Sequence, residues 1–212
     1  MKYYPYEDYL GGKSILEYEV IGPKGPPRAL VDANSMYYRP SWYCNDSSIT
    51  VTLSGITGNY RVSIYFLDWD APNGAEHRKL EVNVTNSNDW AVVTLGTTFP
   101  ENFAAGAYAI FEVNSVGLIK IKVTNLNYPW NSAVISGVFL DAIPGPVTGV
   151  NFVGLDRDTQ GNWRPKYGNS YYLLPGFNVP LSGVSYKPIN KLYDETNIAL
   201  PGNYDCLLYT SP

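Results

Sequence analysis

Short stretches in which apolar and polar residues alternate run through the middle of the chain, and they constrain its fold more than any other feature. They include 49–53, 62–66, 80–84 and 118–123, with Gly, Asn, Asp and Pro residues between them. Side chains of a strand point alternately to its two faces, so the pattern predicts half-buried β-strands. Ser48 to Asp141 is therefore predicted to form an all-β, antiparallel β-sandwich, and only Pro100 to Gly106 is a candidate for a short turn of helix.

The same alternation predicts which side chains point into the core of this sandwich. They are Ile49, Val51, Leu53, Val62, Ile64, Phe66, Val82, Ile119, Ile121, Val123, Ile135 and Val138.

Composition agrees with this fold class and excludes two kinds of partner. The 212 residues include 19 Tyr, 19 Gly and 16 Pro, and only 16% are charged, which is typical of turn-rich β proteins. The formal net charge is −4 without a basic run, so nucleic acid is not an expected partner. No stretch approaches the roughly 18 apolar residues of a membrane span, and the first ten residues lack a signal-peptide core.

The order of the segments suggests a repeat protein. Asp156 to Leu174 resembles the opening of a domain although it comes late in the chain, and Pro144-Gly145-Pro146 stands before it as a hinge. Residues 1–143 are therefore interpreted as a β-sandwich repeat lacking its opening segment, and 144–205 as the opening of a second repeat. Residues 206–212, CLLYTSP, match a translated sequencing adapter and are expected to be dispensable, with a genuine apolar strand as the alternative.

Several motifs together carry a resemblance to a known family. They are Asp156–Trp163 (DRDTQGNW), Tyr167-Gly168, Arg28-Ala29-Leu30, Trp42-Tyr43, Leu67–Asp70 (LDWD), Gly106-Ala107-Tyr108, Leu118–Thr124 and Ala133–Asp141 (AVISGVFLD). In permuted order, they resemble a tandem module of large secreted bacterial proteins. The chain departs from that pattern at Asn169–Tyr172, where a second glycine is missing, and at Leu140, which replaces a phenylalanine.

This resemblance implies a jelly-roll or galactose-binding-like sandwich, an extracellular or cell-surface location, and carbohydrate binding by association with glycan-active or adhesive domains. It identifies no ligand. Two glycosylation sequons, at Asn45 and Asn83, suit a secreted surface.

Aromatic residues are the main binding candidates, because the flat faces of Trp and Tyr can stack on sugar rings while offering a polar group. Trp42, Tyr43 and Trp130, near Pro40 and Pro129, are the candidate ligand-binding residues. Trp69 and Trp163 are predicted to be core residues, and the place of Trp90 is left open. Cys44 is expected to be a small buried hydrophobe.

The loop that follows Leu67 is a candidate cation site. Asp68, Asp70 and Asn73 supply closely spaced oxygens that suit a structural Ca²⁺ ion, although the spacing is not that of an EF-hand. The alternative is a strand-to-loop corner in which Asp70 caps backbone amides and pairs with Arg78.

Catalysis has little support in the sequence. His77 is the only histidine and lies in a polar loop, so neither a catalytic triad nor a transition-metal site is indicated. Candidate carboxylates for glycoside hydrolysis are Asp68, Asp70, Glu76, Glu101 and Glu112, and their spacing selects no pair.

The sequence therefore predicts a non-catalytic, extracellular module whose partner is a polysaccharide or glycan, or which acts as a spacer. The alternatives are a self-associating fibre or sheath repeat and a glycan-active hydrolase or lyase fragment. Val147 to Leu174 is expected to fold back on the first sandwich, with Trp163 packing near Leu67–Asp70. A separate half-domain, or exchange with a neighbouring molecule, is the alternative.

Overall fold

The alternating stretches form strands throughout the computed structural model, which describes residues 2–3, 14–31, 35, 37–44, 47–68, 78–95, 103–127, 132–164 and 166–174. No helix occurs among these residues, and Phe103 to Gly106 form a tight turn, so the predicted all-β class is confirmed. The strands are β1 (Lys2–Tyr3), β2 (Ser14–Gly22), β3 (Leu30–Val31), β4 (Tyr37–Cys44), β5 (Ser48–Phe66), β6 (Leu80–Thr85), β7 (Trp90–Leu95), β8 (Ala107–Asn125), β9 (Ala133–Ile135), β10 (Gly137–Ala142), β11 (Val150–Asp156) and β12 (Tyr171–Leu173).

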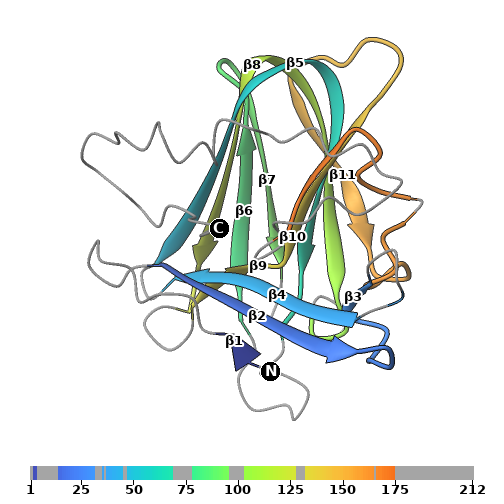
Figure 1. Ribbon diagram of the computed structural model, residues 1–212. Coiled ribbons are helices and arrows are strands. Elements are labelled where there is room, and N and C mark those ends of the chain that lie inside the picture. Colours follow the sequence, from blue (N-terminus) through green and yellow to red (C-terminus); the bar gives the residue numbers. More distant parts are fainter. Residues whose placement is uncertain are drawn as a thin grey trace, which may run out of the picture.

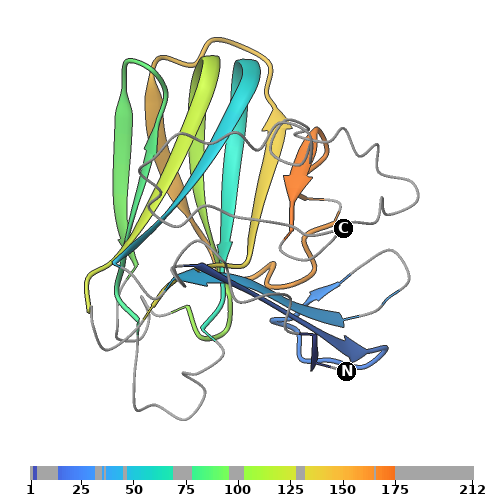
Figure 2. The same ribbon diagram turned by 60° about the vertical axis from the view of Figure 1, so that its left-hand side comes forward.

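Two long strands organise the larger of two antiparallel sheets. This seven-stranded sheet has the order β12-β10-β5-β8-β6-β7, with β11 also paired to β8. Strands β5 and β8 are 19 residues each and pair along their whole length. Both turn over at the top of the molecule and descend on its two sides (Figures 1 and 2).

The bend is built where two glycines meet. The register of β5 and β8 shifts between Ser54 and Ile56, and Ile56 is opposite Gly117. Gly55 and Gly117 have φ angles of 78° and 117°, a region that L-residues with a side chain rarely adopt. The sequence separates into two alternating stretches at this point because the chain changes direction there.

The bend makes one sheet serve as two layers. The covered half-sheet consists of β11, 107–117 of β8, 56–66 of β5, β10 and β12; the other half-sheet consists of 48–54 of β5, 118–125 of β8, β6 and β7. Except for β9, the strands of 48–141 thus belong to one continuous sheet, which differs from the two separate sheets predicted. Two strands of 19 residues are long enough to run through both layers, so no break in hydrogen bonding is needed.

The inner core lies between the two half-sheets and is mainly aliphatic. All twelve residues predicted to point inward are buried in it, each with at most 1% of its surface exposed. They come from both half-sheets, so burial of apolar surface, worth about 25 cal/mol per Å², stabilises the bend itself.

The smaller sheet has the order β1-β2-β4-β3, with β9 paired to β4. It lies across the lower ends of the long strands in both views (Figures 1 and 2). The chain changes sheets at Ser136: Ala133–Ile135 pair with β4, and Gly137 onward pairs with β5. The N–H of Ser136 donates to the Tyr65 carbonyl (2.9 Å), which fixes this crossing point.

Val147 to Leu174 folds back on the sheet, as expected. β11 pairs with β8 at one edge of the covered half-sheet, and β12 pairs with β10 at the other. The connection between them therefore crosses the outer face over β8, β5 and β10. Trp163, in this connection, packs in a cluster that includes Leu67. The interpretation of this segment as part of a second repeat stays a prediction.

The expected hinge is held to the sheet rather than free. Ile143 donates its N–H to the Asn59 carbonyl (3.0 Å), and the Asn59 side chain donates to the Gly145 carbonyl (2.6 Å). Asn114 donates its N–H to the Gly149 carbonyl (2.9 Å) and its side-chain amide to Asn59 (2.7 Å). The Pro/Gly segment thus joins β10 to β11 as a loop that is hydrogen-bonded to the sheet.

Candidate functional site

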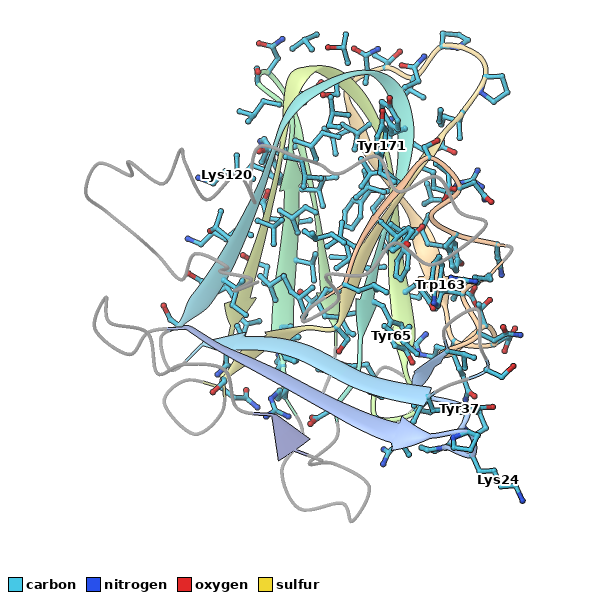
Figure 3. All side chains as sticks on the ribbon, viewed as in Figure 1. Lys24, Tyr37, Tyr65, Lys120, Trp163 and Tyr171 are labelled. Atoms are coloured by element: carbon cyan, nitrogen blue, oxygen red, sulfur yellow. The ribbon has the colours of Figure 1, made fainter. Side chains whose placement is uncertain are left out.

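The outer core, on the outer face of the covered half-sheet, is largely aromatic. Its members are Leu30, Tyr65, Leu67, Tyr108, Phe139, Trp163, Tyr167, Tyr172 and Leu174. The rings of Tyr65 and Tyr108 lie 4.5 Å apart, and those of Tyr108 and Tyr167 lie 4.4 Å apart. Trp163 is 1% exposed and contacts Phe139 at 5.1 Å, which confirms its prediction as a core residue (Figure 3).

Three of the stacked tyrosines donate their hydroxyls to the segments that cover the outer core. Tyr65 donates to the Arg28 carbonyl (2.6 Å), Tyr108 to the Gln160 carbonyl (2.5 Å), and Tyr167 to Oδ2 of Asp156 (2.5 Å). Burial raises the pKa of all three hydroxyls above the ordinary value of a tyrosine, so they stay protonated donors. The stack thereby positions the two loops that cover it.

Asp156 organises the loop that begins the D-x-x-T-Q-G-N-W motif. Its carboxylate accepts the N–H groups of Asp158 (2.9 Å) and Thr159 (3.1 Å), the Thr159 hydroxyl (2.6 Å) and Nζ of Lys166 (2.7 Å). Burial alone would raise the pKa of Asp156, but the hydrogen bonds from Lys166, Thr159 and Tyr167 hold that pKa well below its usual range. The carboxylate is therefore a fixed anion that shapes the loop.

The motif loop is joined to the Arg28-Ala29-Leu30 segment by backbone bonds. Gly161 donates to the Pro27 carbonyl (2.9 Å) and accepts from the Val31 N–H (3.2 Å), while Nε1 of Trp163 donates to the Val31 carbonyl (3.1 Å). A Cβ at position 161 would lie 1.7 Å from the Ala29 carbonyl oxygen, so only glycine fits. The Arg28-Ala29-Leu30 segment and the T-Q-G-N-W segment meet here, and the hydrogen bond from Trp163 to Val31 joins residues 132 positions apart.

An open groove of about 590 Å³ lies between these joined segments. One wall carries Pro27, Val31 and Tyr37; the other carries Asp158, Thr159, Gln160, Asn162, Arg164 and Lys166. Its lining mixes amide, hydroxyl and cationic groups with one aromatic ring, which is the mixture that orients a polar ligand. Figure 3 shows Tyr37 at the same end of the molecule as Trp163.

The tyrosine in this groove is held in place. Gly25 packs so closely on Tyr37 that an added Cβ would lie 2.5 Å from the Tyr37 Cβ. Tyr37 is only partly buried, at the start of β4. Its ring is thus a fixed and accessible surface in the groove wall.

The side chains of the three predicted aromatic binding residues are not among those the structure describes, so their role stays a prediction. Trp42 and Tyr43 lie in β4 and pair with Ile135 and Val134 of β9, but their side chains, like that of Cys44, are not among those the structure describes. Trp130 and Trp69 lie outside the described residues. Trp90, left open by the sequence, is 64% exposed at the start of β7.

The predicted calcium ligands are described only at Asp68. Asp68 is 2% exposed; Oδ1 pairs with Nη1 of Arg78, and Oδ2 accepts the Arg78 N–H (3.3 Å). Asp70, Asn73 and His77 lie outside the described residues. In the part of the chain that is described, no group of three or more His, Cys, Asp or Glu side chains is arranged to hold a metal ion. A structural Ca²⁺ ion stays a prediction.

Sequence reasoning missed the groove, because its walls come from segments far apart in the chain. The signal that could have found it was the shared presence of R-A-L and T-Q-G-N-W in one family pattern. No family model, curated protein or solved structure matches this chain. Among the described residues no helix is long and apolar enough to cross a membrane.

Proposed function

We propose that the chain is a non-catalytic glycan-binding module whose ligand lies in the groove between 27–37 and 158–166. The observation that carries this proposal is the groove lining: Thr159, Gln160 and Asn162 beside the ring of Tyr37. Sugar hydroxyls need both donors and acceptors, which the side-chain amides of Gln160 and Asn162 supply. The C–H face of a sugar ring needs a flat apolar partner, which Tyr37 supplies.

The groove is also formed before a ligand arrives. Backbone bonds at Gly161 and Val31 hold its two walls together, and Asp156 holds the motif loop in shape. A preformed site spends little binding free energy on ordering loops, which supports binding of a flexible polymer.

Binding is tested first with a glycan array and then by calorimetry on the glycan found. Tyr37→Ala is expected to weaken binding at least about tenfold, the loss of one stacking contact and its polar handle. The matched control is Trp90→Ala, which removes an exposed aromatic outside the groove. If binding is lost with Trp90→Ala and kept with Tyr37→Ala, the binding site lies at β7 and the proposed site in the groove is wrong.

The non-catalytic part of the proposal is supported by what the described carboxylates already do. Asp68 pairs with Arg78, Glu112 pairs with Arg61 (3.2 Å), and Asp141 accepts the N–H groups of Gly168 and Asn169. Among the described residues that line the groove, Asp158 is the one carboxylate, and glycoside hydrolysis uses two. Sustained polysaccharide turnover that a single Asp or Glu substitution abolishes would overturn this part.

An extracellular or cell-surface location belongs to the same proposal and rests on the family resemblance and the sequons. Fractionation of cells that produce this protein, with detection in the medium, the cell surface and the cell interior, tests this location directly.

A second candidate function is self-association, and the edge of β7 favours it. Among the described strands β7 pairs only with β6, and its sequence WAVVTL has no charge. Edge strands of this kind pair with other chains unless they are protected. Sedimentation over a concentration series tests it: Val92→Lys should abolish association of the wild-type chain, and a monomer at all concentrations would exclude this function.

A further inference from the structure

We infer that the groove selects anionic glycans and that the guanidinium of Arg164 binds their carboxylate or sulfate groups. This inference rests on the proposed function, because it names the class of glycan that the same groove binds.

Arg164 is held in position without being neutralised. Its Cζ lies 4.9 Å from the centre of the Trp163 ring, on which the guanidinium stacks. Trp163 is fixed in the outer core by its bond to Val31 and by ring contacts with Phe139 and Tyr172. A guanidinium on such a support loses little freedom when it binds a planar anion.

The donors of Arg164 have no acceptor in the described part of the chain. Nε and Nη2 are hidden from solvent and make no hydrogen bond there. Leaving buried donors unsatisfied costs about 1–3 kcal/mol, so such groups call for an explanation, and a missing ligand is one. A carboxylate or sulfate accepts two parallel N–H bonds from a guanidinium, so an anion that displaces the atoms covering Nε and Nη2 would satisfy both donors.

The charges around Arg164 agree with an anionic ligand. Lys166, the other cation of the groove, pairs with Asp156 (2.7 Å) and is thereby largely neutralised. Arg157, in the same loop, also has Nε and Nη2 without an acceptor among the described residues. The loop thus carries two arginines whose Nε and Nη2 atoms have no acceptor among the described residues, against one carboxylate, Asp158, in the described groove lining.

The test compares three polymers by calorimetry: polygalacturonate, its methyl-esterified form, and a sulfated galactan. The esterified form keeps the sugar ring and removes the charge. Polygalacturonate is expected to bind at least about tenfold more tightly than its ester, with affinity that falls as NaCl rises above about 0.1 M. Comparing polygalacturonate with the sulfated galactan shows which anion is preferred.

Three variants separate charge recognition from a loss of folding. Arg164→Gln should reduce polygalacturonate binding about tenfold and leave binding of the ester unchanged, while Arg164→Lys should restore part of the difference. The matched control is Lys120→Gln, an equal charge change on β8 at the opposite end of the molecule (Figure 3). Melting temperatures of all variants report whether the fold is kept.

Each outcome decides one question. Equal binding of polygalacturonate and its ester, still weakened by Tyr37→Ala, overturns the inference and leaves the proposed function standing. Equal losses with Arg164→Gln and Lys120→Gln also overturn it, because the effect is then one of net charge. Failure of all three polymers to bind overturns the inference, and the glycan array then decides the proposed function separately.

Discussion

Both faces of the covered half-sheet are buried, and they are packed with different kinds of side chain. Its inner face is packed with Val, Ile, Leu and Phe from neighbouring strands, and these residues need no hydrogen-bond partner. Its outer face is packed with aromatic residues that include Tyr65, Tyr108, Tyr167 and Trp163, and the polar atoms of these four donate to the segments that cover the face. The inner face stabilises the fold by burying apolar side chains. The outer face also buries side chains, and it positions the segments that form the groove.

The largest expected effect comes from emptying the outer core. Trp163→Ala should lower the free energy of unfolding by about 4 kcal/mol, because it leaves a large cavity and frees the Val31 carbonyl. The variant should also lose glycan binding, because the groove walls separate. Urea denaturation measures the first effect; a loss below about 1 kcal/mol would show that the loop contributes little to the fold.

The next largest effect is a pH-dependent change in stability, and it comes from Asp156 at the outer face. The pKa of Asp156 is held low in the folded chain, against about 3.9 in the unfolded chain. Its contribution is therefore full above about pH 5 and is lost as pH falls below about 4 towards the folded-state pKa. Asp156→Asn should cost about 2 kcal/mol at pH 7, the loss of charge-assisted hydrogen bonds.

The same variant should lose less additional stability than the wild type on acidification. Urea midpoints at pH 7 and pH 3 measure the difference. An acid response identical in the two proteins would mean that the carboxylate is not the group that holds the loop.

A smaller effect distinguishes the two cores directly. Tyr108→Phe removes one hydroxyl from the outer core and should cost about 1 kcal/mol, with a measurable loss of glycan affinity. Ile121→Val removes one methylene from the inner core and should also cost about 1 kcal/mol, but leave affinity unchanged. If both variants bind equally well, stability and the groove are not linked through the tyrosine stack.

The smallest effect is expected at the end of the chain. Deleting 206–212 should change the melting temperature by less than the equivalent of about 0.5 kcal/mol, the scale of a neutral surface change. A loss above about 2 kcal/mol, the scale of a core contact or a disulfide, contradicts the interpretation of these residues as adapter sequence.

The two faces also differ in how far the sequence predicts them. Alternation locates the inner core because apolar residues, such as Ile49, Val62 and Ile121, occur at every second position of their strands. The same alternation assigns Tyr65, Tyr108 and Asp141 to a solvent face, and period alone cannot show that a loop covers it. Trp163 was predicted as core from its motif and not from periodicity.

The groove could not be predicted from the sequence pattern, for a geometric reason. Tyr37 and Arg164 lie on opposite walls of the groove. These walls come together only when β11 has paired with β8 and β12 has paired with β10, at the two edges of the covered half-sheet. The continuous sheet was also missed, because the break at Gly55 in β5 separates two strands in the sequence pattern and bends one strand in three dimensions.

The bond from Trp163 to Val31 joins residues 132 positions apart. During synthesis on the ribosome, the outer face around Tyr65 and Tyr108 is made long before its cover. Until residue 163 leaves the exit tunnel, a broad aromatic surface stays open to water and to other nascent chains. We therefore expect ribosome-bound chains ending before Trp163 to bind chaperones more strongly than chains ending after Leu174.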